Sequence, residues 1–232
     1  MNIRKSAGSP FRTVIFLKPH EVDKMCLEAL RAAKLLPDEP SPIDIEGFIE
    51  NYLKARLDFG TDLGSDVLGF TFFSDKGKPE IVGISPKLDE RTQISDRRIR
   101  ATLAHEAGHA MIHPILFMTE GGQMELNGNN VDLVQRRILC RKADINPKPG
   151  WDGRWWELQA NYCIGGFLLP KQLVAKCVDQ LMTSTGLLGG QFLENAARED
   201  AVQLVAEKFE VNPIVAKIRL TTLFPENAEA EL

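Results

Sequence analysis

Residues 102–110 of this 232-residue chain read T-L-A-H-E-A-G-H-A, and they contain the pattern H-E-x-x-H. His105 and His109 are spaced i, i+4, so on an α-helix their imidazoles lie on one face, about one turn apart, where both can bind one zinc ion. Glu106 lies on a neighbouring face, where its carboxylate can act as a base beside the metal without ligating it. The pattern therefore predicts a zinc site on a helix.

The sequence around this motif favours a helix. Ser95 is a typical N-cap residue, and Pro114 is expected to end the helix. Ile99, Leu103 and Met111 can face a core while the two histidines face a cleft. The alternative is a buried helix with two incidental histidines. Histidine and glutamate are uncommon enough that a chance match in such a chain is on the order of one in a few hundred.

Composition limits the class of protein. With 44% hydrophobic residues, the chain can form one domain, or one domain with a small appendage. The net charge of −4 and the pI near 5.7 give no sign of binding to nucleic acid or a membrane surface. No apolar run reaches the ~18 residues of a membrane span, and residues 14–17 are too few for the apolar core of a signal peptide. The scattered cysteines form no C-x-x-C pair, so a cytoplasmic protein is expected.

Two helices and a small sheet are expected before the motif. Residues 1–18 predict an irregular arm, and apolar spacing predicts helices over 19–36 and 43–56, separated by a proline-rich linker. Runs of β-branched and aromatic residues at 67–73 and 79–84 predict two strands of a small antiparallel sheet. An edge strand near the metal would allow an extended substrate to pair with the sheet.

Residues 115–150 are rich in turn signals, and a connection of this length is typical of a lid or a binding loop. A short helix is expected within it, at 131–141, and a flexible loop is expected later, at 183–190. Further helices are expected at 151–169, 171–182, 193–209 and 213–223.

Catalytic zinc needs a third protein ligand besides the two histidines. His113 lies eight residues beyond His105, or ~12 Å along a continuing helix, so it cannot converge on the same ion. Glu157 is a better candidate, because its i+4 neighbour Asn161 can hydrogen-bond a ligating histidine and fix its tautomer. A solvated helix face explains this pair about as well. Three acidic residues in turn-rich sequence also remain candidates for the third ligand: Glu120, Glu125 and Asp152.

Two motifs together resemble the ImmA/IrrE family of metallopeptidases. The first, T-L-A-H-E-A-G-H-A-M-I-H, covers residues 102–113, and the second, W-E-L-Q-A-N-Y-C-I-G-G-F-L-L-P, covers 156–170. The resemblance extends over residues 43–224. It implies three zinc ligands and a catalytic base: His105, His109 and Glu157 as ligands, and Glu106 as the base.

The resemblance also implies a substrate, a helix-turn-helix transcriptional repressor whose cleavage switches on a stress or mobile-element response. The chain departs from the family pattern at Tyr162 and Cys163, and the gap of 48 residues (157 − 109) between the second histidine and Glu157 is long for the family. An endopeptidase of broad specificity and unregulated activity would be harmful in the cytoplasm. We therefore expect narrow specificity, or a gate formed by residues 115–150.

Three small residues in or between the two motifs also have expected roles. Gly108 lowers helix propensity, and we expect it to permit close approach of the helix that carries Glu157. Cys140 could bind zinc as an inhibitory thiolate, because the basic residues around it can lower the pKa of its thiol. A buried structural cysteine is the favoured interpretation of Cys140, and Cys163 is expected in the core. The basic neighbours of Cys140 are Arg136, Arg137, Arg141 and Lys142.

The C-terminal helices have a helix-turn-helix rhythm, with Asn212 as the expected N-cap of the second helix and Pro213 at its first position. Only Lys208, Lys217 and Arg219 are basic there, whereas a helix that reads DNA normally carries more positive charge. We therefore expect a packing or partner-recognition element rather than a DNA-binding one.

The sequence as a whole predicts an α+β fold. It comprises an N-terminal arm (1–18), a mostly helical zincin-like metallopeptidase domain with a small antiparallel sheet (19–182), and a C-terminal helix-turn-helix-like region (183–232). The predicted function is a zinc-dependent endopeptidase that cleaves a helix-turn-helix repressor. Two alternatives are a binding module with structural zinc, and a DNA-binding regulator of the toxin–antitoxin type that uses Lys217 and Arg219.

Overall fold

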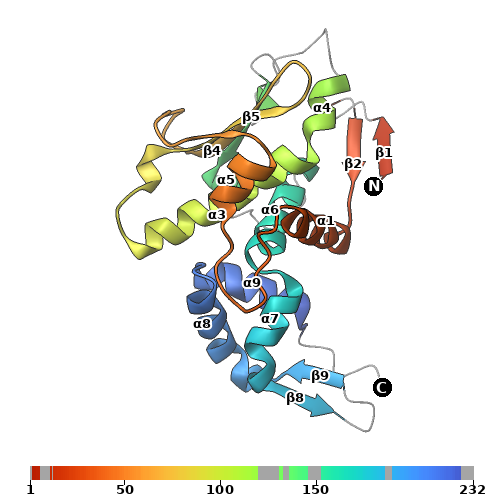
Figure 1. Cartoon of the computed structure of the whole chain (residues 1–232), viewed down its shortest axis with the longest axis vertical. Coiled ribbons are helices and arrows are strands. Elements are labelled where there is room, and N and C mark those ends of the chain that lie inside the picture. The colour runs from red at the N-terminus through yellow and green to blue at the C-terminus, as the bar shows by residue number, and fades with distance from the viewer. Residues whose placement is uncertain are drawn as a thin grey trace.

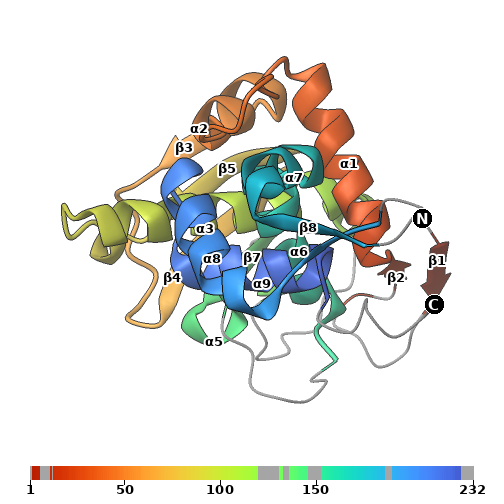
Figure 2. The ribbon, with the colours of Figure 1, turned by 90° about the horizontal axis from the view of Figure 1, so that it is seen from below.

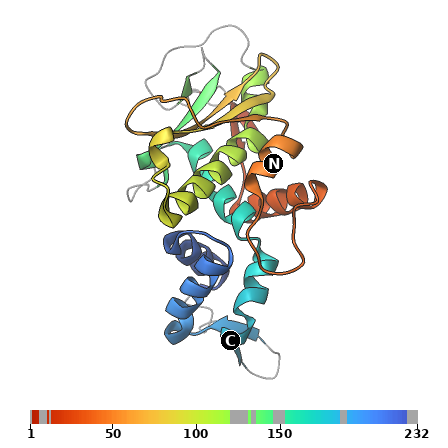
Figure 3. The same ribbon diagram turned by 60° about the vertical axis from the view of Figure 1, so that its left-hand side comes forward.

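A five-stranded mixed sheet lies against helix α3 (Gln93–Ile112), and the C-terminal helices lie on the other side of α6 (Trp155–Leu168), away from the sheet (Figures 1 and 3). The described part of the chain is α+β and mostly helical, as predicted. The computed structural model describes residues 2–5, 11, 13–119, 131–132, 136–145, 153–185 and 190–225.

The sheet has the strand order β3-β5-β4-β7-β6. The predicted hairpin is confirmed, because β4 and β5 occupy the predicted ranges and pair antiparallel. The sheet is not wholly antiparallel, since β3 runs parallel to β5. The strands are β3 (Arg56–Asp58), β4 (Val67–Phe73), β5 (Pro79–Ile84), β6 (Val131–Asp132) and β7 (Arg137–Arg141).

Strand β7 corrects two predictions. Residues 131–141 were expected to form a helix, but Ile138 and Cys140 are buried and alternate with half-buried neighbours, which is the two-residue period of a strand. Strand β7 pairs antiparallel with β4 along the edge that β5 leaves free. Strand β4, which contacts Glu106 of the H-E-x-x-H motif through Thr71, therefore has a neighbouring strand on both sides. It is not the edge strand that we expected beside the metal.

Helix α3 begins earlier than predicted. Thr92 is its N-cap, and its side chain accepts a hydrogen bond from the backbone N–H of Ser95. The hydroxyl oxygen of Ser95 accepts in turn from the backbone N–H of Thr92, which completes a capping box and satisfies two N–H groups. Ser95 is thus the third residue of the helix, and not its cap. The helix ends before Pro114, as predicted, and α4 (Pro114–Thr119) follows directly.

The N-terminal segment is partly regular. The predicted irregular arm contains an antiparallel hairpin, β1 (Asn2–Lys5) with β2 (Thr13–Phe16). The predicted helix at 19–36 is α1 (Pro19–Ala32). The helix predicted at 43–56 is short, with one α-turn, α2 (Ile45–Gly47), followed by a π-helical turn over Phe48–Tyr52 and then by β3.

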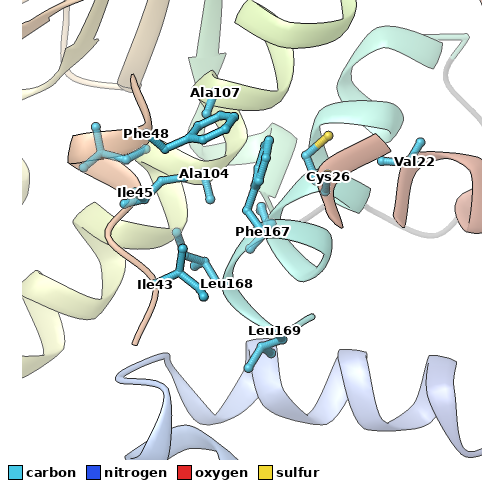
Figure 4. Packing of buried hydrophobic residues seen from close by; sticks show 14 of the residues in the cluster. Val22, Cys26, Ile43, Ile45, Phe48, Ala104, Ala107, Phe167, Leu168 and Leu169 are labelled. Carbon is cyan, nitrogen blue, oxygen red and sulfur yellow. The ribbon is translucent and has the colours of Figure 1, made fainter. Parts of the chain in front are cut away.

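One cluster of buried residues joins helices α1, α3 and α6 to strands β2, β4, β5 and β7. Figure 4 shows Phe167 of α6 between Phe48 and Cys26, and the rings of Phe167 and Phe48 lie 4.8 Å apart between centroids. Full burial of a phenylalanine or leucine side chain stabilises a fold by about 1.5–3 kcal/mol. This packing holds α6 against α1 and the π-helical turn. None of the helices in the described ranges has the length and apolar character needed to cross a membrane.

The C-terminal region contains more strand than predicted (Figure 2). Helix α7 is shorter than the predicted 171–182, and the flanks of the expected loop at 183–190 form an antiparallel hairpin, while residues 186–189 lie outside the described residues. The predicted division of the chain at residue 183 stays a prediction. The elements here are α7 (Lys171–Val178), β8 (Met182–Thr185), β9 (Gly190–Leu193), α8 (Arg198–Lys208) and α9 (Pro213–Leu223).

Arg219 ties α9 to the rest of the fold. Its side chain is only 6% exposed, and its guanidinium donates to both carboxylate oxygens of Asp23 in α1, at 2.9 and 3.0 Å. Its Nε–H donates to the carbonyl of Leu169, at 2.9 Å. A buried, hydrogen-bonded arginine of this kind holds elements together and does not face a nucleic acid. The donors of Arg219 are thus used within the fold, which does not favour Arg219 as a DNA contact.

Candidate metal centre

Three buried side chains from two helices converge on one point. His105 and His109 of α3 place their Nε2 atoms 3.0 Å apart. Glu157 of α6 places Oε2 3.2 Å from Nε2 of His105 and 3.6 Å from Nε2 of His109. The two imidazoles are fully buried and Glu157 is 4% exposed. These three residues form a possible metal-binding group.

The neighbours of His105 fix its tautomer. The amide Nδ2 of Asn161 donates to the backbone carbonyl of Asp144, at 2.8 Å, so Oδ1 is the atom that faces His105. That oxygen lies 3.0 Å from Nδ1 of His105 and can only accept, so Nδ1 carries the proton. In the neutral imidazole the lone pair of Nε2 then points at Glu157, and in the imidazolium the same nitrogen donates a hydrogen bond to that carboxylate. Asn161 thus has the role that its i+4 spacing from Glu157 indicated.

A longer chain of hydrogen bonds fixes the tautomer of His109. Nε2 of Gln159 donates to the carbonyl of Ile15, at 2.6 Å, so Oε1 of Gln159 accepts from Nε2 of His113, at 3.2 Å. Nδ1 of His113 is then the acceptor in its 2.9 Å contact with Nδ1 of His109. His109 therefore also presents the lone pair of its Nε2. His113 lies outside the possible metal-binding group, and it does more than end a helix, because its contact orients His109.

The tautomers make this site fit a cation. Three acceptor atoms, two imidazole nitrogens and a carboxylate oxygen, face one another within 3.6 Å. Such atoms repel one another unless a proton or a metal ion lies between them. The second oxygen of Glu157, Oε1, is buried and has no hydrogen-bond partner in the described part of the chain. Two imidazoles and one carboxylate are a usual set of zinc ligands.

The charges of the site agree with this arrangement. Burial alone would raise the pKa of Glu157, but the charges and hydrogen bonds of His109 and His105 outweigh burial and lower that pKa. Burial lowers the pKa of His105, yet its hydrogen bond to Glu157 and the charge of that carboxylate raise it overall. Burial also holds the pKa of His113 well below its usual value, which keeps this imidazole neutral. A positive charge is thus favoured beside Glu157.

Glu106 lies beside the three ligand candidates, outside their group. Its Oε2 accepts a hydrogen bond from the hydroxyl of Thr71 in β4, at 2.7 Å, and its buried Oε1 has no partner in the described residues. Gly69, two residues earlier in β4, leaves room for the carboxylate, because a Cβ there would lie 2.9 Å from Oε1. Burial raises the pKa of Glu106 to about 8, against the charge of His105 and the hydrogen bond from Thr71. Sequence reasoning missed Thr71 and Gly69.

Cys140 forms a second group with His105 and Glu106, in which donor atoms lie within 4.8 Å of one another. The expectation that basic neighbours lower the pKa of its thiol is wrong. Burial raises that pKa well above its usual value, and the charges of Glu106 and Glu157 raise it further. Cys140 is fully buried, whereas Arg141 points outward to an ion pair with the exposed Asp66.

Gly108 lets α3 and α6 approach each other, as expected. A Cβ at Gly108 would lie 2.7 Å from Cβ and 2.9 Å from Sγ of Cys163, and 3.3 Å from Cα of Ala160. Cys163 is a fully buried core residue, also as expected. The close approach of the two helices brings Glu157 within reach of the histidines.

Gly108→Ala should therefore destabilise the protein, although alanine is the better helix former by about 1 kcal/mol. The added methyl group overpacks the interface between the helices, and we expect a net loss of about 1–3 kcal/mol in the free energy of unfolding, measured by urea denaturation. Cys163→Gly in the same chain removes the clashing Cβ, so the double variant should be more stable than the sum of the single effects predicts. A Gly108→Ala protein as stable as the wild type would contradict this account of the helix contact.

The other acidic candidates from the sequence, Glu120, Glu125 and Asp152, lie outside the described residues, as does most of the expected lid at 115–150. No protein-family model matches this chain, and no curated protein matches it either.

Proposed function

We propose that this chain is a zinc-dependent endopeptidase. His105, His109 and Glu157 hold the ion, and Glu106 is the general base. The convergence of three acceptor atoms on one point is the observation that carries this proposal. Beside them lies a carboxylate oxygen of Glu106 that has no hydrogen-bond partner among the described residues. Three protein ligands leave one position of a tetrahedral ion open, as catalytic sites require. Zinc bound here would acidify water and polarise the carbonyl group of a peptide bond.

The chain's own part in the reaction is proton transfer by Glu106. A pKa of about 8 lies near neutral pH, where a general base works best, and a nearby cation lowers this pKa so that the carboxylate is ionised before the reaction. Thr71 holds one carboxylate oxygen in place. The other oxygen, Oε1, has no hydrogen-bond partner in the part of the chain that the structure describes, so it can take a proton from the attacking water and deliver it to the leaving amine.

The proposed substrate is a helix-turn-helix transcriptional repressor, and its cleavage would switch on a stress or mobile-element response. The resemblance of residues 102–113 and 156–170 to the ImmA/IrrE motifs supports this choice. A largely apolar groove of about 960 Å³ also supports a protein substrate. It runs from Asn161, which orients His105, to Ile214 and Ile218 of α9, whose side chains are more than half exposed.

A binding module with structural zinc is the second candidate, and the burial of the site favours it. The side chains of His105, His109 and Glu106 are fully buried, whereas a catalytic centre must admit substrate. Removal of a structural ion unfolds a protein, while removal of a catalytic ion abolishes activity and can leave the fold intact. Circular dichroism and hydrolysis measured side by side during chelation separate the two functions.

The experiment that tests the proposal is a substrate trap. Glu106→Gln protein, which should bind but not cleave, is expressed in cells, and the proteins that co-purify with it are identified. These are then offered to the wild type with and without chelator. Glu80→Gln is a matched control, because it makes the same chemical change on an exposed part of β5 and should cleave like the wild type. If no repressor binds, or if one binds and is never cut at any zinc concentration, the proposed function is wrong.

A further inference from the structure

Cys140 faces the metal centre from the sheet. Strand β7 pairs with β4 so that Cys140 lies opposite Gly69. On the same face of β4, Thr71 donates to Glu106, and the open side of Gly69 accommodates the Glu106 carboxylate. The fully buried thiol of Cys140 therefore shares this face with the proposed base, within 4.8 Å of a donor atom of both Glu106 and His105.

The end of β7 is fastened to the helix that carries Glu157. The backbone N–H of Arg141 donates to Oδ2 of Asp144, at 2.6 Å, and Arg154 forms an ion pair with the same carboxylate. The backbone carbonyl of Asp144 accepts from Asn161, the residue that orients His105. These contacts hold Cys140 beside the ligands, and they join the position of β7 to the geometry of His105.

Unsatisfied acceptors point to a cation within reach of this thiol. Oε1 of Glu106 and Oε1 of Glu157 are both buried without a hydrogen-bond partner in the described ranges. Glu106 belongs to the group that contains His105 and Cys140, and Glu157 belongs to the group that contains His105 and His109. Zinc binds cysteine thiolates strongly, and a thiol that coordinates zinc loses its proton. A cation shared by these groups would thus have a sulfur ligand at hand.

We propose that Cys140 is a fourth, inhibitory ligand of the metal ion held by His105, His109 and Glu157. The inference rests on the proposed function, since it concerns the coordination position that a reacting water would use. The S–H bond breaks, the proton goes to solvent, and the sulfur bonds to the ion in place of water. Four protein ligands make a closed site, so hydrolysis stops while the thiolate is bound.

The arrangement allows two positions of the sulfur. Cys140 is outside the group formed by His105, His109 and Glu157, so its thiol must move toward these residues to complete a four-ligand site. With the thiol withdrawn, the fourth position is open to water. Movement of β7 or a change at the Asp144 contacts would shift the balance between the closed and open forms.

Cobalt(II) spectroscopy tests the ligand directly and does not depend on catalysis. The metal-free full chain is loaded with Co²⁺, as wild type and as Cys140→Ser, Cys140→Ala and Cys163→Ala. We expect a near-ultraviolet thiolate-to-cobalt charge-transfer band in the wild type and in the Cys163→Ala control, and no such band in either Cys140 variant. Metal analysis and circular dichroism confirm that every protein binds cobalt and is folded. A cobalt-loaded wild type without the band would overturn the proposal.

Hydrolysis by the zinc-loaded proteins then tests the inhibitory role. If the thiolate occupies about 90% of the sites, Cys140→Ala raises the rate about tenfold. A charge-transfer band in the wild type with an unchanged rate in Cys140→Ala would overturn the inhibitory role. A band with no hydrolysis by either protein would instead leave the ligand in place and refute the peptidase, so the two failures are distinguishable.

Discussion

Glu157→Ala protein is expected to purify almost without zinc, whereas the wild type carries about one ion per chain. The carboxylate is the only charged ligand of the three, and its removal leaves two neutral imidazoles that cannot hold a divalent ion in competition with water. His105→Ala and His109→Ala should lose the metal in the same way. Metal analysis of the purified proteins, followed by titration against a zinc chelator, measures the effect.

His113→Ala is the matched control for these ligand variants. The imidazole of His113 is as buried as those of His105 and His109 and touches His109, but it lies outside the possible metal-binding group. Loss of a residue that orients a ligand typically weakens metal binding by about 10–100-fold, so this variant should still fill with zinc when the metal is in excess. A full complement of zinc in Glu157→Ala protein would refute the proposed set of ligands. His113→Ala protein that binds no zinc, even with the metal in excess, would instead make His113 a ligand.

The sequence predicted the parts of the site that depend on local spacing. The i, i+4 histidines fall on one helix face wherever α3 lies, and the same spacing made Asn161 a candidate partner for a ligand next to Glu157. The two strands of the β4–β5 hairpin were also predicted with their observed bounds, because a turn separates two runs of β-branched and aromatic residues.

Other parts could not be predicted, because they depend on contacts between distant segments. The tautomer of His109 depends on Gln159, whose amide is fixed by a hydrogen bond to Ile15, 144 residues away in sequence. The environment of Glu106 depends on Thr71, which lies 35 residues earlier. Arg219 looked like a surface cation on its own helix, and only the position of Asp23 in α1 shows why it is buried.

Strand β7 shows a different limit. Its five residues are too few to separate a strand from a helix by periodicity, and its flanking basic residues suggested an activated thiol. The pairing with β4 decides the secondary structure, since it satisfies the backbone groups along that edge. The same pairing buries Cys140 among carboxylates, which reverses the expected change in the pKa of its thiol.

Glu106→Gln is expected to abolish peptide hydrolysis while zinc stays bound, because the amide cannot take a proton from the attacking water. Loss of a general base typically lowers the rate by about 10²–10⁴-fold. The same substitution should change the stability of the metal-free protein. The pKa of Glu106 is about 8 in the fold, against 4.5 for an ordinary glutamate, because burial disfavours its charge.

The sign of this stability effect follows from proton binding. Between pH 4.5 and 8 the folded chain keeps the proton of Glu106 and the unfolded chain releases it, so rising pH favours the unfolded chain. Each pH unit in this window costs about 1.4 kcal/mol, which amounts to about 3 kcal/mol by pH 7. The glutamine does not titrate, so the variant lacks this loss.

Urea denaturation of the chelator-treated proteins between pH 5 and 8 measures the difference. The free energy of unfolding of the wild type should fall relative to that of Glu106→Gln by about 1.4 kcal/mol per pH unit across this range. A buried glutamine amide without a hydrogen-bond partner also lowers the free energy of unfolding of the variant by about 1–3 kcal/mol. This cost is the same at every pH, so it leaves the slope unchanged. The slope is therefore the diagnostic quantity. Parallel curves for the two proteins would show that Glu106 is ionised in the metal-free fold, and the raised pKa that we assign to this buried carboxyl would then be wrong.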